Sequence, residues 1–221
     1  MFSWFATEYK HGGWPLGVVW FLAAFSAIIV IERFIALYLV ALENKDGLLR
    51  GLHGHILKGD VPAAIRFIDA QRSGPLSRIV KAGLVRINKS DKEVQASLDE
   101  ASLREVPYLE KRTGYLAVLS NATTLVGLLG TIIGMIHCFA AVAHVDPAQK
   151  ATILAGGISE AMTCTKWGLG VAIVLLLIYS VFQARTQQLT DRINETVVSV
   201  LNLALSNKQA LKNSESAASA R

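Results

Sequence analysis

An acid, two threonines and a lysine lie close together in an apolar stretch in the last third of the sequence. They are Glu160, Thr163, Thr165 and Lys166, all within the segment Ser159–Gly168. If this stretch spans a membrane, charged groups cost free energy unless they face a protein interior or a water-filled path. A single threonine would indicate only a hydroxyl bonded to the preceding turn. Four polar groups together predict an ion path or a polar lumen that binds a partner.

A second apolar stretch presents a face of small residues. Gly127, Gly130 and Gly134 recur at spacings of three and four residues, which places them close together around a helix. Small side chains let helix backbones approach closely in lipid, so we assign these three glycines to helix packing. Thr124, Thr131 and Cys138 continue the same pattern of small residues.

Other kinds of chemistry find little support in the sequence. His53 and His55 are two residues apart, but no third ligand cluster accompanies them, so we predict no metal site. No glycine-rich phosphate loop follows a strand, so direct use of a nucleotide is not expected, and no cofactor is predicted. No nucleophile–base or metal constellation is visible, and we therefore do not expect an enzyme. Cys138 and Cys164 fall in apolar stretches and are predicted to be packing residues, not a disulfide.

Three long apolar stretches must position these side chains. Apolar residues make up 52% of the chain, the mean hydropathy is +0.40, and the stretches are Leu16–Val40, Tyr115–Val145 and Ala151–Phe182. A bilayer core is roughly 30 Å thick and takes about 20 helical residues to cross. We therefore predict an all-α integral membrane protein with three transmembrane helices and a helical cytoplasmic domain, with helices that extend from the membrane into the cytoplasm.

The basic residues predict the orientation of these spans. The formal net charge is +5, and nearly all lysines and arginines lie between the first two stretches or after the third. Since positive residues stay on the cytoplasmic side, the N-terminus is predicted to be periplasmic and the C-terminus cytoplasmic. This distribution argues against nucleic acid as the partner of the basic residues. We predict no cleaved signal peptide and an uncleaved first anchor.

These observations give an expected order of segments along the chain. We expect a short external segment at 1–14, spans at 15–41, 115–145 and 151–183, a helical cytoplasmic domain at 42–114, and a cytoplasmic helix with a polar tail at 184–221. Helices are predicted to start near Asp60, Ser73 and Ser90. The helix from Ser90 is expected to run into the second span with a kink at Pro107, and the tail from Asn207 is expected to be disordered.

Three motifs in this order resemble the ExbB/TolQ/MotA family of ion channels, with a layout closest to ExbB and TolQ. They are Arg104–Pro107, Gly127–Thr131 and the acid-led stretch Ser159–Thr165, and the resemblance extends from Gly59 to Phe182. It implies a homo-oligomeric ring, expected to be a pentamer, in lipid of the bacterial inner membrane. The ring would surround ExbD/TolR/MotB-like partners, each with one span and a membrane aspartate, and a TonB- or TolA-like protein is a further candidate partner.

The resemblance also assigns roles to individual residues. Thr131 and Thr165 match the ring threonines that face the partner's aspartate, and Glu160 matches the acid of the third span. The expected function is a motor subunit that uses ion flow, with protons favoured over sodium ions, to energise envelope transport or mechanical work. A gliding or flagellar-type stator and a non-conducting scaffold remain alternatives.

Three residues depart from the family pattern. Thr124 stands where a proline is common, which puts in doubt a mechanism that needs a kink there. Lys166 stands where a small residue is usual. It is either neutral, since burial lowers the pKa of a lysine, or paired with Glu160 of a neighbouring copy. His137 lies beyond Thr131 and is either a proton relay or, as we prefer, an interfacial hydrogen-bond donor.

Overall fold

The computed structural model describes residues 2–40, 45–57, 61–71, 74–87, 89–143 and 145–219, and its elements over these residues are all helices. They form two compact units. The membrane unit comprises Met1–Arg33 and Arg112–Phe182, and the polar unit comprises Phe34–Lys111 and Gln183–Arg221.

Three helical stretches among the described residues are long and apolar enough to cross a membrane. They are Gly13–Tyr38, Asp91–Ala143 and Pro147–Ser206. The predicted fold class, an all-α protein with three spanning helices, is thereby confirmed. The chain is a multi-pass membrane protein.

The first helix of the membrane unit contains a sharp bend. Helix α1 covers Phe2–Phe34 and is interrupted at Gly13, where φ is 62° and ψ is −164°. A positive φ favours glycine because it has no Cβ to clash with the backbone. Pro15 follows within the first turn of the continuing helix, where its missing N–H costs no helical hydrogen bond. A short π-helix, η1, follows α1 at Ile35–Val40.

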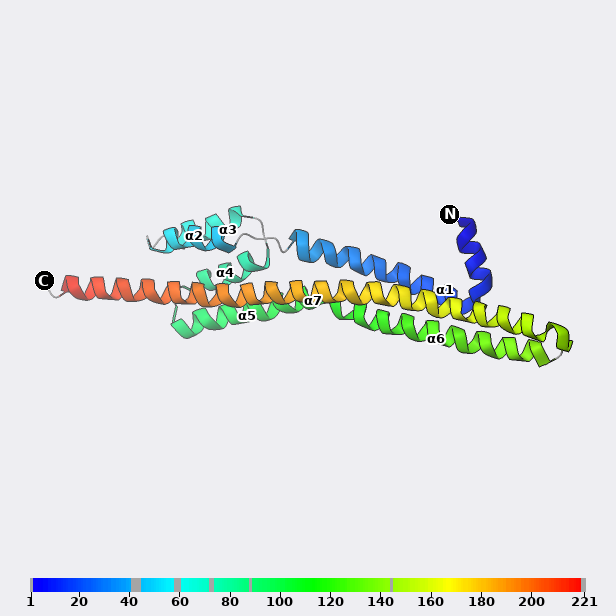
Figure 1. Cartoon of the computed structure of the whole chain (residues 1–221). Coiled ribbons are helices and arrows are strands. Elements are labelled where there is room, and N and C mark those ends of the chain that lie inside the picture. The colour runs from blue at the N-terminus through cyan, green and yellow to red at the C-terminus, as the bar shows by residue number, and fades with distance from the viewer. Residues whose placement is uncertain are drawn as a thin grey trace. The chain divides into compact units, whose positions relative to one another are not determined.

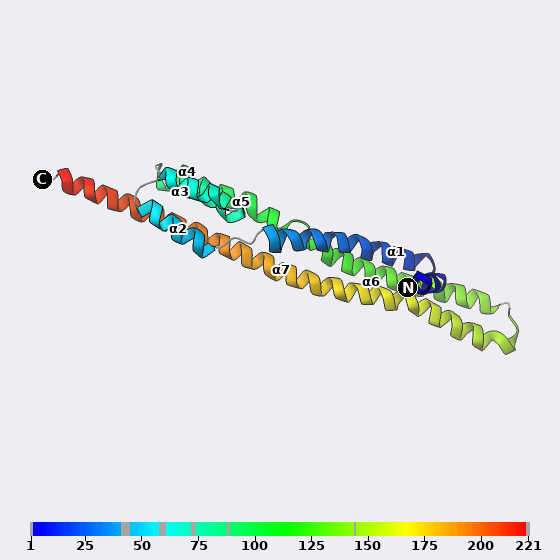
Figure 2. The ribbon, with the colours of Figure 1, turned by 90° about the horizontal axis from the view of Figure 1, so that it is seen from above.

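Helices α6 (Thr113–Ala143) and α7 (Pro147–Ser219) form an antiparallel pair in the membrane unit. Figures 1 and 2 both show α6 alongside the first half of α7. Small residues lie where the two backbones meet. The hairpin end of the membrane unit is the end at which α6 stops and α7 begins.

Four shorter helices build the polar unit: α2 (Lys45–Leu57), α3 (Val61–Ala70), α4 (Pro75–Val85) and α5 (Asp91–Glu110). Each packs on the next along the chain. Their apolar faces supply a buried core that includes Leu52, Ile56, Ile68, Leu84 and Leu98. Burial of such side chains is the main favourable contribution to folding.

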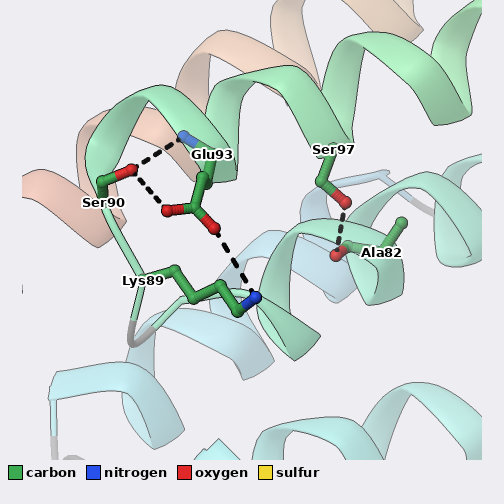
Figure 3. A network of polar contacts seen from close by, with 5 residues as sticks. All are labelled: Ala82, Lys89, Ser90, Glu93 and Ser97. Carbon is green, nitrogen blue, oxygen red and sulfur yellow. Dashed lines mark hydrogen bonds and ion pairs between the residues drawn. The ribbon is translucent and has the colours of Figure 1, made fainter.

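A capping box begins α5, as the sequence predicts for Ser90. The Ser90 hydroxyl accepts a hydrogen bond from the Glu93 backbone N–H at 3.3 Å and donates to the Glu93 carboxylate at 2.9 Å (Figure 3). In the same view the Ser97 hydroxyl donates to the Ala82 carbonyl of α4 at 2.9 Å. The other two predicted helix starts, Asp60 and Ser73, lie outside the described residues.

The predicted continuity of the Ser90 helix with the second span is wrong. Pro107 lies within α5, which ends at Glu110, and α6 begins at Thr113. Between them Arg112 has a φ of 66°, a left-handed conformation that no α-helix continues through. The break therefore lies after the proline and not at it.

The predicted disorder of the C-terminal tail is also wrong for residues 207–219. Helix α7 continues to Ser219. No glycine or proline follows Gly170, and the tail contains several alanines and two lysines, which have high helix propensity. Composition alone was a poor guide to this segment.

Candidate functional site

The small-residue faces of α6 and α7 meet in a seam with backbone contact. A Cβ added at Gly168 would lie 2.9 Å from the Gly127 Cα and 3.0 Å from the Thr123 carbonyl oxygen. A Cβ added at Gly127 would lie 3.1 Å from both the Gly168 Cα and the Cys164 carbonyl oxygen. No side chain fits between the helices at this level, which explains why glycine occurs on both.

The seam continues toward the hairpin end through two further glycines. A Cβ at Gly130 would come within 2.5 Å of the Cys164 Cβ, and one at Gly134 within 2.7 Å of the Ala161 Cβ. Each step forward along α6 is matched by a step of similar size back along α7, as expected for an antiparallel pair. This register places Thr131 at nearly the depth of Thr165.

Two hydroxyl groups tie the helices together across the seam. The Thr165 Oγ1 of α7 donates to the Gly127 carbonyl of α6 at 2.9 Å. In the opposite direction, the Ser120 Oγ of α6 donates to the Ala172 carbonyl of α7 at 2.8 Å. The donors and acceptors lie two turns apart on each helix, so the two bonds fix one register. The role of Ser120 was not predicted from the sequence. The signal that could have suggested it is its spacing from Gly127, which puts both residues on one face of the helix.

The remaining threonine hydroxyls bond within their own helices. Thr131 donates to the Leu128 carbonyl at 2.6 Å, and Thr163 donates to the Ser159 carbonyl at 3.1 Å. Thr131, Thr163 and Thr165 are all half-buried. A hydroxyl that donates its proton still has lone pairs on its oxygen. These oxygens can accept a hydrogen bond from water or contact a cation.

A cavity of about 340 Å³ lies in the membrane unit beside the Gly13 bend. Glu160 and His137 both line it, and both are exposed. The other lining residues are all small or apolar: Gly13, Trp14, Pro15, Gly130, Ile133, Gly134, Cys138, Ala141, Ile153, Gly157, Ala161 and Cys164. The two cysteines are buried free thiols, which confirms their prediction as packing residues.

Lys166 is exposed and contacts an aromatic side chain. Its Nζ lies 5.5 Å from the centre of the Trp167 ring. Trp167 in turn meets Trp20 of α1 edge to face, with ring centres 5.9 Å apart. A cation over an indole face is stabilised by the ring quadrupole. Lys166 and Glu160 are thus placed on different sides of α7, the first over the tryptophan and the second at the cavity.

Two ion pairs distant from these residues were not anticipated from the sequence. In the membrane unit, Glu32 near the end of α1 pairs with Arg112 just before α6. In the polar unit, the Arg78 guanidinium forms two hydrogen bonds to the Glu105 carboxylate, at 2.7 and 2.6 Å. Glu105 belongs to a motif that the sequence analysis singled out, but nothing in the sequence identified its partner. Among the described residues, no group of three potential metal ligands occurs.

Comparison with known proteins identifies the family. Residues 71–195, more than half of the chain, match the MotA/TolQ/ExbB proton channel family. The chain is 31% identical over 130 residues to a putative ExbB-like biopolymer transport protein of Synechocystis sp., covering 58% of this chain and 62% of that protein. It is 27% identical over 186 residues to a putative ExbB homologue of Methanothermobacter thermautotrophicus, covering 84% of this chain and 65% of the homologue.

The Tol-Pal system protein TolQ of Pseudomonas aeruginosa is 36% identical over 99 residues, which cover 45% of this chain and 42% of TolQ. The chain therefore matches less than two thirds of the length of each of these curated relatives. The matched region includes the α6–α7 seam and both candidate threonines, Thr131 and Thr165. On this basis the chain belongs to the MotA/TolQ/ExbB proton channel family.

Proposed function

We propose that this chain is the channel-forming ring subunit of a motor in the bacterial inner membrane. It uses ion flow, with protons favoured over sodium ions, to energise envelope transport together with an ExbD/TolR-like partner. The partner has a single span and a membrane aspartate that accepts the ion. The ring is a homo-oligomer, with a pentamer expected, and a TonB- or TolA-like protein receives the mechanical output.

One observation carries this proposal beyond family membership. Thr131 and Thr165 lie at similar depth on adjacent helices, on either side of a seam too tight for larger side chains. Both hydroxyls donate to backbone carbonyls, so both oxygens can face an ion or a water. Next to the partner's carboxylate, these two fixed oxygens can replace some of the water molecules that surround a passing ion.

The test is ion flux into liposomes that contain the ring and its single-span partner. We expect the double variant Thr131→Val, Thr165→Val to lose at least tenfold in flux, since valine keeps the shape but removes both oxygens. Thr124→Val is the matched control, because Thr124 also donates within its own helix, to the Ser120 carbonyl at 3.1 Å, but lies outside the proposed path. Unchanged flux in the double variant would refute the path.

The main competing function is a scaffold that assembles a complex and conducts nothing. A scaffold has no use for two threonine oxygens held at similar depth beside the seam, which is why we favour the channel. A gliding or flagellar-type stator remains a second candidate within the same family. Identification of the co-purifying single-span partner distinguishes these systems, because the partner determines which machine receives the motion.

A further inference from the structure

Glu160 and Lys166 are exposed on two different faces of α7. They are six residues apart, which corresponds to about 120° around a helix and about 9 Å along it. Glu160 lines the cavity at the Gly13 bend. Lys166 lies on the side opposite the seam formed by Ala161, Cys164 and Gly168. The two charges therefore mark two separate surfaces of the same membrane unit.

The surface around Lys166 is otherwise apolar and accessible. Met162, Leu169 and Ile173 share its face of α7 and are 63%, 45% and 55% exposed. Such a surface in a membrane contacts either lipid or another protein. Since a lysine at this depth is unfavourable in lipid, a protein surface with a complementary charge is the better match for it.

The surface around Glu160 has the chemistry to receive an ammonium group. The cavity beside it is about 340 Å³, within the range of small-ligand pockets, and it is lined mainly by small and apolar residues. Its rim includes the carboxylate of Glu160, the imidazole of His137 and the indole of Trp14, which is 59% exposed. A carboxylate attracts the charge, and an aromatic face adds cation–π attraction.

We propose that Lys166 of each copy inserts into this cavity of the next copy and pairs there with Glu160. This inference rests on the proposed ring. A closed ring needs a heterologous interface, in which two different patches of each copy are complementary, and the Glu160 and Lys166 faces form such a pair. The sequence alone left open whether Lys166 is neutral or paired.

The direction of the lysine side chain supports the same pairing. Side chains on a helix slope toward its N-terminus, which for α7 is the hairpin end. In two parallel copies side by side, Lys166 of one copy therefore extends toward the depth of Glu160 in the other. The axial offset of about 9 Å is of the size that a lysine and a glutamate side chain bridge together.

Charge reversal in the full complex tests the pairing, with native mass spectrometry to measure the ring fraction. Glu160→Lys and Lys166→Glu should each lower the ring fraction at least tenfold, because each puts like charges together. The double reversal should restore it to within about twofold of wild type. Lys150→Glu, a reversal on the same helix away from both surfaces, serves as the matched control and should leave the ring fraction unchanged.

Cross-linking tests the geometry independently of stability. In a Cys138→Ala, Cys164→Ala background, the pair Glu160→Cys, Lys166→Cys should give a ladder of multimers with a short bis-maleimide, ending at the ring size. Each single cysteine should give no ladder. The pair Glu160→Cys, Leu177→Cys is the control, since Leu177 lies on the Lys166 face, 63% exposed, but three turns deeper.

The outcomes separate this inference from the proposed function. An intact ring in native mass spectrometry with no ladder, or with cross-links from residue 166 only to the single-span partner, overturns the pairing but leaves the motor intact. Absence of any ring in the wild-type complex contradicts the proposed function itself. A ladder together with rescue by the double reversal supports both.

Discussion

At the scale of single residues, we propose that Thr165 adds a role in the ion path to its structural role. Its hydroxyl donates to the Gly127 carbonyl across the seam, while its oxygen remains able to contact an ion. Hydrogen bonds between membrane helices contribute about 0.6 kcal/mol on average. Loss of this bond therefore weakens the helix pair only slightly, so a large loss of flux would have to come from the missing oxygen.

Two substitutions at Thr165 distinguish the hydrogen bond from the role of the oxygen. Thr165→Ser keeps the hydroxyl, and we expect it to retain flux within about threefold of wild type. Thr165→Val should lose at least fivefold in flux while its free energy of unfolding falls by only about 0.6 kcal/mol. Flux in liposomes and thermal unfolding in detergent, measured on the same preparations, check both parts. A Thr165→Ser variant as inactive as Thr165→Val would contradict the role of the oxygen.

A second residue-scale prediction concerns Glu93 in the polar unit. The Ser90 hydroxyl, by donating a hydrogen bond to the carboxylate, lowers the pKa of Glu93 from its ordinary value, and the charge of Lys89 contributes in the same direction. Because the pKa of Glu93 is lower in the folded chain than in the unfolded chain, its ionised carboxylate stabilises the folded chain at pH values above the unfolded pKa. This stabilisation is lost as the pH falls through the folded pKa. The start of α5 should therefore weaken in acid.

The measurement is an NMR titration of Glu93 in the full chain in detergent. Ser90→Ala should raise the pKa of Glu93 toward its ordinary value and reduce the pH dependence of stability in the acidic range. Ser102→Ala is the control, since the Ser102 hydroxyl donates to the Leu98 carbonyl of its own helix, away from Glu93. An unchanged Glu93 pKa in Ser90→Ala would show that the cap does not determine it.

At the scale of helices, the sequence supports the existence of the elements better than their ends. Apolar length predicted the three spans, and the spacing of Gly127, Gly130 and Gly134 indicated a packing face. The break before α6 could not be predicted, because lysine and arginine are good helix formers. Arg112 is instead paired with Glu32, eighty residues earlier, a tertiary contact that no local pattern encodes.

The seam makes a prediction for two neighbouring glycines. An added Cβ at Gly168 would lie 2.9 Å from backbone, whereas one at Gly170 would have nothing within 4 Å. Gly168→Ala should therefore destabilise the chain by about 1–3 kcal/mol through overpacking. Gly170→Ala should be neutral or stabilise by up to about 1 kcal/mol through helix propensity. Thermal unfolding in detergent compares them, and equal effects would show that the backbones are not in contact there.

At the scale of the whole molecule, the candidate site was only partly accessible from sequence. The motifs identified Thr131, Thr165 and Glu160 through family resemblance, and the polar cluster drew attention to Lys166. The cavity at the Gly13 bend was not predictable, because residues from three helices line it. The faces of α7 on which Glu160 and Lys166 lie were also not predictable, because they are defined relative to the seam with α6.

The membrane unit also predicts how the protein lies in the bilayer. About 20 helical residues cross a bilayer core. Counted from the Glu32–Arg112 ion pair, this length ends near the Gly13 bend on α1 and near Ile132 on α6. The α6–α7 hairpin beyond that level, which includes Glu160 because Ala161 lies against Gly134, is therefore predicted to protrude into water, while Thr165 and Lys166 stay in the outermost turn of the bilayer core. From the distribution of basic residues we predict that this water is the periplasm.

Cysteine labelling in intact cells tests this topology. In a background without native cysteines, Ala140→Cys and Ala155→Cys, both at exposed positions of the hairpin, should react with an impermeant maleimide. Leu103→Cys, at a position 76% exposed in the polar unit, should react only after the inner membrane is permeabilised. Leu125→Cys should stay unlabelled in both cases, because its 64% exposed side chain faces lipid or protein within the bilayer. Labelling of Leu103→Cys but not Ala140→Cys in intact cells would reverse the orientation, and with it the side from which the ion enters.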